Sequence, residues 1–364
     1  MKDFFDEFLN ADPYGWARPE KHGTLTAALK SLTEHHVGRC AAYRNMMSAL
    51  RLDLDAVSSY EELPFLPVSL FKDLKLSSIS DEEVFKTMTS SGTTGQAVSK
   101  IYLDRETASR QQKTLVKIVS SFTGAARMPM LIIDSPSVIK DRRMFSARGA
   151  GILGFSIFGA DRTYALTDGM QLDIPAIQAF LARHEGQKIL LFGFTFMVWQ
   201  HFYKELLAHP ETKIDLSLGI LIHGGGWKKL IGEAVSPEEF RRRLAEVCGL
   251  SDIHDYYGMV EQTGCVYMQC ECGHLHASNF SDVIIRRARD FSVADFGERG
   301  IVQVVSVLPL SYPGHSLLTE DEGAILGEDD CECGRKGKYF KIFGRLQNAE
   351  IRGCSDTYAA GFKA

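Results

Sequence analysis

The chain has 364 residues, 45% of them hydrophobic, and a formal net charge of −5 at pH 7. This length and composition allow a substantial buried core. The negative charge argues against nucleic acid as a main partner, because phosphate backbones attract clustered Lys and Arg side chains. No stretch approaches the roughly 18 apolar residues of a membrane span, and acidic residues interrupt the N-terminus, unlike in a signal peptide. We therefore expect a cytoplasmic protein with no membrane span.

The first 60 residues are predicted to be mostly helical, because Leu25, Leu29 and Leu32 recur at helical spacing. A stretch punctuated by proline follows. Residues 84–103 then predict a strand, a glycine-rich turn and a second strand, and residues 104–122 predict a helix.

From about residue 128, short apolar runs alternate with helical patterns. Residues 130–133 and 188–194 are typical of buried parallel strands. Residues 173–184 and 197–209 are typical of the helices that connect such strands. This alternation predicts an α/β fold.

The pattern changes after Tyr257. Short strand-like runs separated by turns follow, such as DVIIRRA and GIVQVVSVLPL. They predict a small β-rich subdomain at about residues 260–340.

The turn at residues 90–95, SSGTTG, has a composition suited to holding phosphate. Its two glycines, Gly92 and Gly95, allow close approach of the backbone to a ligand, and turn amides can form an anion-binding nest. The loop fits neither the Walker A pattern nor the Rossmann pattern of glycines. An ordinary polar hairpin turn is the alternative, and composition alone favours neither. The hydroxyl donors are Ser90, Ser91, Thr93 and Thr94.

Later segments offer groups that a nucleotide would need. Three glycines, Gly224–Gly226, directly follow a buried-strand pattern, and ligands of α/β sheets bind beyond the carboxyl ends of strands. The segment DYYGMVE supplies an aromatic face at Tyr257 and a carboxylate at Glu261. Further along lie Asp321 and Arg345. Each signal is weak alone, because most surface carboxylates and arginines are simply solvated.

In their order, these segments resemble those of the adenylate-forming enzymes, which make acyl-AMP from a carboxylic acid and ATP. The resemblance implies the N-terminal core of that fold over residues 1–345, with layered α/β subdomains and the β-rich subdomain. It implies that the SSGTTG loop and Lys100 contact the ATP phosphates, that Tyr257 packs against adenine and that Glu261 binds Mg²⁺. Asp321 would hold the ribose hydroxyls with help from Arg345. The implied ATP-contacting residues are Ser90, Ser91, Gly92, Thr93, Thr94, Gly95, Lys100, Gly224, Gly225, Gly226, Tyr257, Gly258, Asp321 and Arg345.

The chain departs from the superfamily pattern in three places. Val260 stands where a phosphate-contacting Thr is usual, and Glu320 where Gly is usual. The chain also ends 19 residues after Arg345, and we therefore expect it to work without the superfamily's mobile C-terminal domain and its catalytic lysine. We expect Lys100 to carry more of the transition-state charge for this reason, and Lys363 in the tail to substitute in part.

A closer resemblance is to the LuxE-type acyl-protein synthetases. Segments such as LPVSLFKDLKL, TSSGTTG, IHGGGWK, YGMVEQTG and GRLQNAEIRGCSDTYA are similar to that family's, in the same order. The resemblance implies activation of a fatty acid by ATP and transfer of the acyl group to a cysteine near the enzyme's own C-terminus. The group then passes to a partner acyl reductase or carrier.

The residue that matches the acceptor is Cys354, in the tail formed by residues 346–364. A thiolate is the reactive form of cysteine, and Arg352 beside it could lower the thiol pKa. Gly353 gives the backbone freedom to bring the thiol to the adenylate. The alternative is an inert tail cysteine, since most free cysteines merely pack.

Two C-x-C pairs predict a structural zinc site, because such sites take four Cys or His ligands from two short segments. The second segment supplies Cys331 and Cys333. In the first, a resemblance to phenylacetate-CoA-ligase-like enzymes implies Cys270 and His276, with Cys272 as the main alternative. The luciferase-operon members lack these ligands, so the resemblance indicates a zinc-bearing side branch.

Three functions compete. The first is an acyl-protein synthetase that uses ATP, Mg²⁺ and a fatty or other carboxylic acid. The second is an acyl-CoA or acyl-carrier ligase in which Cys354 takes no part. The third is a non-catalytic nucleotide-binding subunit. A lone histidine is more often a structural residue than a catalyst; of the histidines near these motifs, His223 beside the glycine loop is the best candidate to touch substrate. Phe192, Phe194, Phe196 and Trp199 line either an acyl pocket or plain core.

Overall fold

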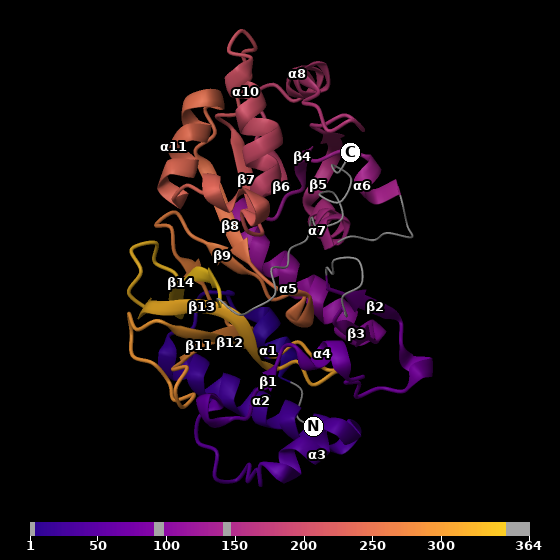
Figure 1. The fold of residues 1–364 in the computed structure, drawn as a ribbon, viewed down its shortest axis with the longest axis vertical. Coiled ribbons are helices and arrows are strands. Elements are labelled where there is room, and N and C mark those ends of the chain that lie inside the picture. The colour runs from indigo at the N-terminus through magenta and orange to yellow at the C-terminus, as the bar shows by residue number, and fades with distance from the viewer. Residues whose placement is uncertain (1–3, 91–97, 141–146, 347–364) are drawn as a thin grey trace. The chain divides into compact units, whose positions relative to one another are not determined.

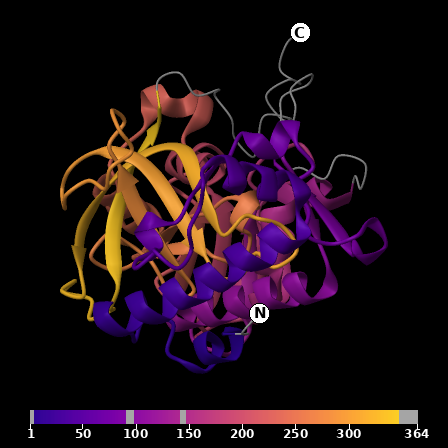
Figure 2. The same cartoon turned by 90° about the horizontal axis from the view of Figure 1, so that it is seen from below.

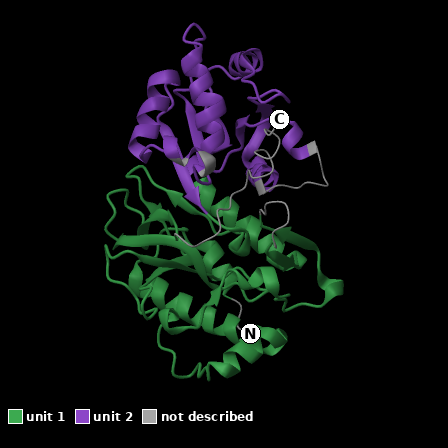
Figure 3. Ribbon diagram, viewed as in Figure 1, with its two compact units in different colours: residues 1–90, 95–121, 258–350 green, residues 91–94, 122–257, 351–364 purple. Residues whose placement is uncertain are grey.

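A computed structural model describes residues 4–90, 98–140 and 147–346. These residues form a mixed α/β fold with two compact units (Figures 1 and 3). Unit 1 contains described residues 4–90, 98–121 and 258–346, and unit 2 contains 122–140 and 147–257. Within the described ranges, no helix combines the length and the apolar character needed to cross a lipid bilayer.

Unit 2 is built on a parallel sheet, as the alternation of apolar runs and helical patterns predicts. Its strands lie in the order β5-β4-β6-β7-β8. They are β4 (Met128–Ile133), β5 (Gly159–Tyr164), β6 (Ile189–Phe194), β7 (Gly219–Gly224) and β8 (Asp252–Tyr257). Strands β6 and β7 are buried at every residue, which explains their continuous apolar sequences.

Helices cover both faces of this parallel sheet. On one face, α8 (Ile174–Arg183), α10 (Lys204–Ala208) and α11 (Pro237–Cys248) contribute to a core with Leu191 and Leu221. On the other face, Phe155 of α7 (Ala147–Phe155) stacks on Phe192 of β6 with ring centroids 4.4 Å apart. The predicted helix at 197–209 begins with the short α9 (Thr195–Met197), continues as a π-helix (Val198–Tyr203) and ends as α10.

Unit 1 contains an antiparallel sheet with the strand order β11-β12-β13-β14-β10-β9, and β1 (Leu66–Pro67) pairs in parallel with β13. The strands are β9 (Tyr267–Gln269), β10 (Leu275–His276), β11 (Ser281–Arg286), β12 (Gly300–Ser306), β13 (Ser316–Glu328) and β14 (Lys338–Arg345). A separate hairpin joins β2 (Lys86–Thr89) to β3 (Lys100–Leu103).

Helix α2 (Arg18–Arg39) covers one face of the antiparallel sheet (Figure 2). Its buried stripe includes Leu25, Leu29 and Leu32, as the helical spacing predicts. The other helices of unit 1 are α1 (Phe5–Asn10), α3 (Ala41–Ala49), α4 (Leu70–Asp73) and α5 (Arg105–Thr123).

Candidate nucleotide site and metal centre

The base of the glycine-rich loop is an ordered hairpin end. Strands β2 and β3 pair as predicted, with Thr89 opposite Lys100. Beyond this pair, the Ser90 amide donates to the Ser99 carbonyl at 3.1 Å, and the Ser99 amide donates to Ser90 Oγ at 2.9 Å. Lys100 itself is exposed. The remaining predicted phosphate-loop residues, Ser91, Gly92, Thr93, Thr94 and Gly95, lie outside the described residues.

The predicted magnesium ligand, Glu261, lies in the same unit as the loop base. Glu261 lies on a short 3-10 helix (Val260–Gln262) and is buried. Burial raises the pKa of its carboxyl, and a hydrogen bond from the Ser99 side chain, followed by the charges of Lys72 and Arg345, opposes that rise. The Tyr312 hydroxyl fixes the backbone by donating to the Glu261 carbonyl at 2.8 Å. A buried carboxylate held in this way has the hard oxygen donors that Mg²⁺ prefers.

Charged residues of β13 and β14 lie together in the same unit. Asp321 and Arg345 are direct cross-strand partners, with Arg345 Nε 3.9 Å from Asp321 Oδ1. Arg345 Nη1 also lies 3.3 Å from Glu320 Oε2, and Lys72 Nζ lies 3.9 Å from Glu320 Oε1. Glu320, a departure from the superfamily pattern, therefore links two cations.

Lys72 is a residue to which the sequence assigned no role. It lies on α4, in the LPVSLFKDLKL segment that carries part of the family resemblance. Its side chain is only 12% exposed, and its charge lowers the pKa of Glu261. Only the tertiary fold brings this lysine to Glu261 and Glu320, because α4 is more than 180 residues away from them in the chain.

In unit 2, the glycine loop after β7 is packed against a tyrosine. A Cβ atom on Gly224 would lie 2.4 Å from the Tyr256 ring, so only glycine fits there. Gly225 has φ of 78°, a left-handed conformation that favours glycine. The Tyr256 ring centroid lies 5.0 Å from that of Phe155, on the face of the sheet where Phe155 stacks on Phe192. The predicted adenine-stacking residue, Tyr257, is the next residue of β8 and therefore points to the opposite face of the strand.

His223 is a buried, neutral side chain. Its Nδ1 lies 2.9 Å from Thr195 Oγ1, and burial lowers its pKa to about 3. The histidine expected to touch substrate is thus held by a neighbouring side chain of unit 2. Phe192, Phe194 and Trp199 are each at most 3% exposed, which is typical of core residues.

Four predicted metal ligands form a cluster in unit 1. Cys270, His276, Cys331 and Cys333 place one ligand atom each within 4.8 Å of one another. Cys270 Sγ lies 3.9 Å from Cys331 Sγ, and Cys333 Sγ lies 3.4 Å from His276 Nε2. Ligands at about 2.3 Å from a tetrahedral zinc would be separated by about 3.8 Å, so these spacings and the three-thiol, one-imidazole donor set fit Zn²⁺.

The two cysteine segments adopt the same turn. Gly273 and Gly334 follow the C-x-C pairs, have φ of 83° and 81°, and donate their amides to the Cys270 and Cys331 carbonyls at 2.9 Å. In each turn the first cysteine is buried, and Cys272 is exposed and outside the cluster. The structure therefore selects Cys270 over Cys272.

The surroundings of the cluster suit a bound cation with thiolate ligands. Burial raises the pKa of Cys270 to about 11 in the free thiol, and amide hydrogen bonds to Cys270 and Cys331 oppose the rise in both thiols. Three thiolates and one Zn²⁺ leave a net charge of −1, and Arg335, whose charge interacts with Cys333, supplies a positive charge. The predicted acyl acceptor, Cys354, lies outside the described residues.

Comparisons with known proteins identify one family and several similar proteins. The family described as acyl-protein synthetase, LuxE, matches residues 2–363. A long-chain-fatty-acid–luciferin-component ligase from Vibrio harveyi is 23% identical over 372 residues, which cover 99% of this chain and 93% of the relative. Its counterpart from Aliivibrio fischeri is 24% identical, covering 96% and 92%. An open conformation of 2-hydroxyisobutyryl-CoA ligase, in complex with 2-HIB-AMP and CoA, has a TM-score of 0.67 at 14% identity over 96% of this chain and 76% of that one.

Proposed function

Because the chain belongs to the acyl-protein synthetase (LuxE) family, we propose that it activates a fatty or other carboxylic acid with ATP and transfers the acyl group to its own Cys354. Family membership makes it a ligase of the adenylate-forming type. In the first step, a carboxylate oxygen attacks the α-phosphorus of ATP, which gives acyl-AMP and releases pyrophosphate. In the second, the Cys354 thiolate attacks the acyl carbon and releases AMP. Delivery to an acyl reductase or carrier would follow.

The observation that supports this proposal most is the buried carboxylate of Glu261, whose backbone carbonyl accepts a hydrogen bond from the Tyr312 hydroxyl at 2.8 Å. The same unit also contains the Lys72, Glu320 and Arg345 cluster. Such an attack requires positioning and charge neutralisation more than acid–base catalysis. When bound, Mg²⁺ would neutralise phosphate charge, and Glu261 would hold it. Asp321 would bind the ribose hydroxyls, with help from Arg345.

The proposal is tested by ATP–pyrophosphate exchange with a panel of carboxylic acids of increasing chain length. We expect exchange that requires an added acid, and the best acid would identify the substrate class. ATP binding without exchange for any acid would instead support a nucleotide-binding subunit.

Lys72 is expected to contribute to adenylation. Replacing it with methionine keeps most of the side-chain volume and should lower the exchange rate about 10- to 100-fold, the effect of losing one charge-assisted hydrogen bond from its ammonium to an ATP phosphate. Lys75→Met is the matched control, because Lys75 lies in the same segment but pairs with the exposed Asp81. Equal exchange rates for the two variants would show that Lys72 takes no part in adenylation. Lys100 would then be the lysine proposed to contact the phosphates.

We also propose that the cysteine–histidine cluster holds a structural Zn²⁺. Its four protein ligands complete a tetrahedron and leave no open position for catalysis. The purified protein should contain one zinc per chain by elemental mass spectrometry. Cys331→Ser should abolish that zinc and lower the thermal midpoint by about 5–10 °C, whereas Cys272→Ser, at the exposed position, should retain it. Full zinc content in Cys331→Ser would refute the ligand assignment.

A further inference from the structure

The N-terminal segment formed by residues 12–21 lies directly against the metal cluster. The Lys336 amide, three residues after Cys333, donates to the Tyr14 carbonyl at 2.9 Å. The Tyr14 ring meets the His276 ring edge-on, with centroids 6.1 Å apart, and the Arg335 guanidinium lies 5.9 Å from the Tyr14 ring centroid. The N-terminal segment thus packs against both segments that carry the predicted metal ligands, although it is more than 250 residues away from them in the chain.

Lys21, at the end of this segment, is buried and contacts residues next to the metal cluster. It lies in the first turn of α2 and is 1% exposed. Its Nζ donates to the carbonyl of Ala277, the residue after the ligand His276, at 3.1 Å, and lies 3.7 Å from Asp282 Oδ2. Burying an unpaired ammonium is very costly, so removing either contact would be unfavourable. The side chain is therefore committed to holding the strand that carries His276.

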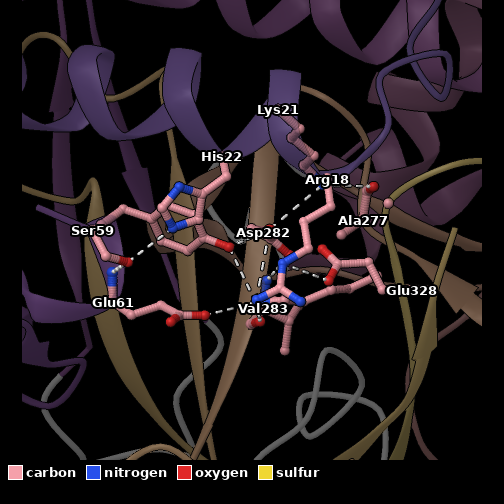
Figure 4. Close-up of polar contacts among 12 residues, drawn as sticks. Arg18, Lys21, His22, Ser59, Glu61, Ala277, Asp282, Val283 and Glu328 are labelled. Carbon is pink, nitrogen blue, oxygen red and sulfur yellow. Dashed lines mark hydrogen bonds and ion pairs between the residues drawn. The ribbon is translucent and has the colours of Figure 1, made fainter.

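A second buried lysine, Lys338, extends the connection to the other cysteine segment. Figure 4 shows Asp282 among Lys21, Glu61 and Ala277. Asp282 accepts a hydrogen bond from the Tyr60 hydroxyl at 2.7 Å, and Lys338 Nζ donates to that same hydroxyl and to Glu61 Oε1, both at 3.1 Å. The Lys338 carbonyl in turn accepts from the Ala277 amide at 3.0 Å. The network thus joins helix α2 to strand β11, which follows His276, and to strand β14, which follows Cys333.

Asp329 makes a separate connection between helix α2 and the second cysteine segment, closer to the surface. Its carboxylate accepts from the Arg18 amide and from the Gly337 amide, each at 2.8 Å. It therefore links the start of α2 to the turn that carries Cys331 and Cys333.

We propose that residues 12–21 act as a lock on the metal centre, with Lys21 and Asp329 as its positioning residues, so that metal binding and docking of this segment stabilise each other. The reason is linkage: groups that hold the ligands in place raise metal affinity, and the metal must stabilise their docking by the same free energy. The inference rests on the metal centre proposed above and does not depend on acyl transfer.

The test compares the Zn²⁺ affinities of variants by competition with a chromophoric chelator. Lys21→Met should bind Zn²⁺ about tenfold more weakly than wild type, as expected for a residue that positions a ligand. Lys30→Met is the matched control, because Lys30 lies on the same helix and donates to a backbone carbonyl, that of Val57, at 2.9 Å. Its affinity should equal that of wild type. Wild-type affinity in a folded Lys21→Met protein would overturn the proposal.

A second variant and a second measurement keep the test decisive if Lys21→Met does not fold. Asp329→Gly removes both acceptors and suits the residue's φ of 69°. We expect it also to weaken Zn²⁺ binding. Amide hydrogen exchange of wild type should increase at residues 12–21 when the zinc is chelated, while α8 in unit 2 stays unchanged. Unaltered exchange of residues 12–21, or a uniform increase throughout both units, would contradict a local lock.

Discussion

Glu261→Gln should lower acid-dependent ATP–pyrophosphate exchange at least about a hundredfold. The substitution keeps the shape of a buried side chain, but it removes the negative charge that would hold Mg²⁺. Loss of a metal-ligand charge or a preorganised electrostatic contact typically costs several kcal/mol in the transition state. The rate is measured at saturating ATP, over a range of Mg²⁺ concentrations.

Glu298→Gln serves as the control for that measurement, because Glu298 is a partly exposed carboxylate paired with Arg287. Its exchange rate should match wild type. The thermal midpoint of Glu261→Gln should not fall, since neutralising a carboxyl whose pKa is raised by burial relieves desolvation. A folded Glu261→Gln protein with exchange within threefold of wild type would refute the assigned role.

Cys354→Ala should abolish acylation of the protein while leaving pyrophosphate exchange intact. The thiol is needed only after acyl-AMP has formed, so the two half-reactions separate in this variant. Intact-mass spectrometry after incubation with ATP, Mg²⁺ and acid should show an acyl adduct in wild type that hydroxylamine removes, and none in Cys354→Ala. Cys272→Ala should keep the adduct, because it removes an exposed cysteine of unit 1 to which the proposal gives no role.

The same experiment separates the acyl-protein synthetase from a CoA ligase. A CoA ligase would show no adduct on any cysteine and would form acyl-CoA when CoA is supplied, equally in wild type and Cys354→Ala. An adduct that persists in Cys354→Ala would place the acceptor elsewhere in the chain.

Much of the candidate site follows from local sequence patterns. The strand–loop–strand pattern at residues 84–103 correctly predicts the β2–β3 hairpin, because its apolar runs and glycines fix a local structure. The two C-x-C segments, with the Cys270–His276 pairing that the resemblance implies, predict four ligand residues, and these lie within 4.8 Å of one another. The choice of Cys270 over Cys272 does not follow from the spacing: Cys270 is buried with its Sγ 3.9 Å from Cys331 Sγ, whereas Cys272 is exposed.

Long-range contacts could not be predicted in this way. Lys72 reaches Glu320 through the packing of α4, and no local pattern indicates that partner. Lys21 continues the stripe of Leu25 and Leu29 at helical spacing, but a lysine at the end of an apolar stripe is normally solvated. Its burial depends on Asp282, which lies in the other half of the chain. Tyr256 and Tyr257 are adjacent in β8 and so point to opposite faces of the strand, and the sequence alone does not show that Tyr256 is the one that packs against Gly224.

Attack of the acid on the α-phosphorus of ATP is tested most directly by an isotope experiment. The protein is incubated with ATP, Mg²⁺ and a carboxylic acid labelled with ¹⁸O in both oxygens, and the nucleotide products are analysed by mass spectrometry. Acyl-AMP formation followed by acyl transfer predicts AMP that carries one ¹⁸O atom, together with unlabelled pyrophosphate. Formation of ADP, with ¹⁸O in inorganic phosphate, would show attack on the γ-phosphorus instead and would contradict this account.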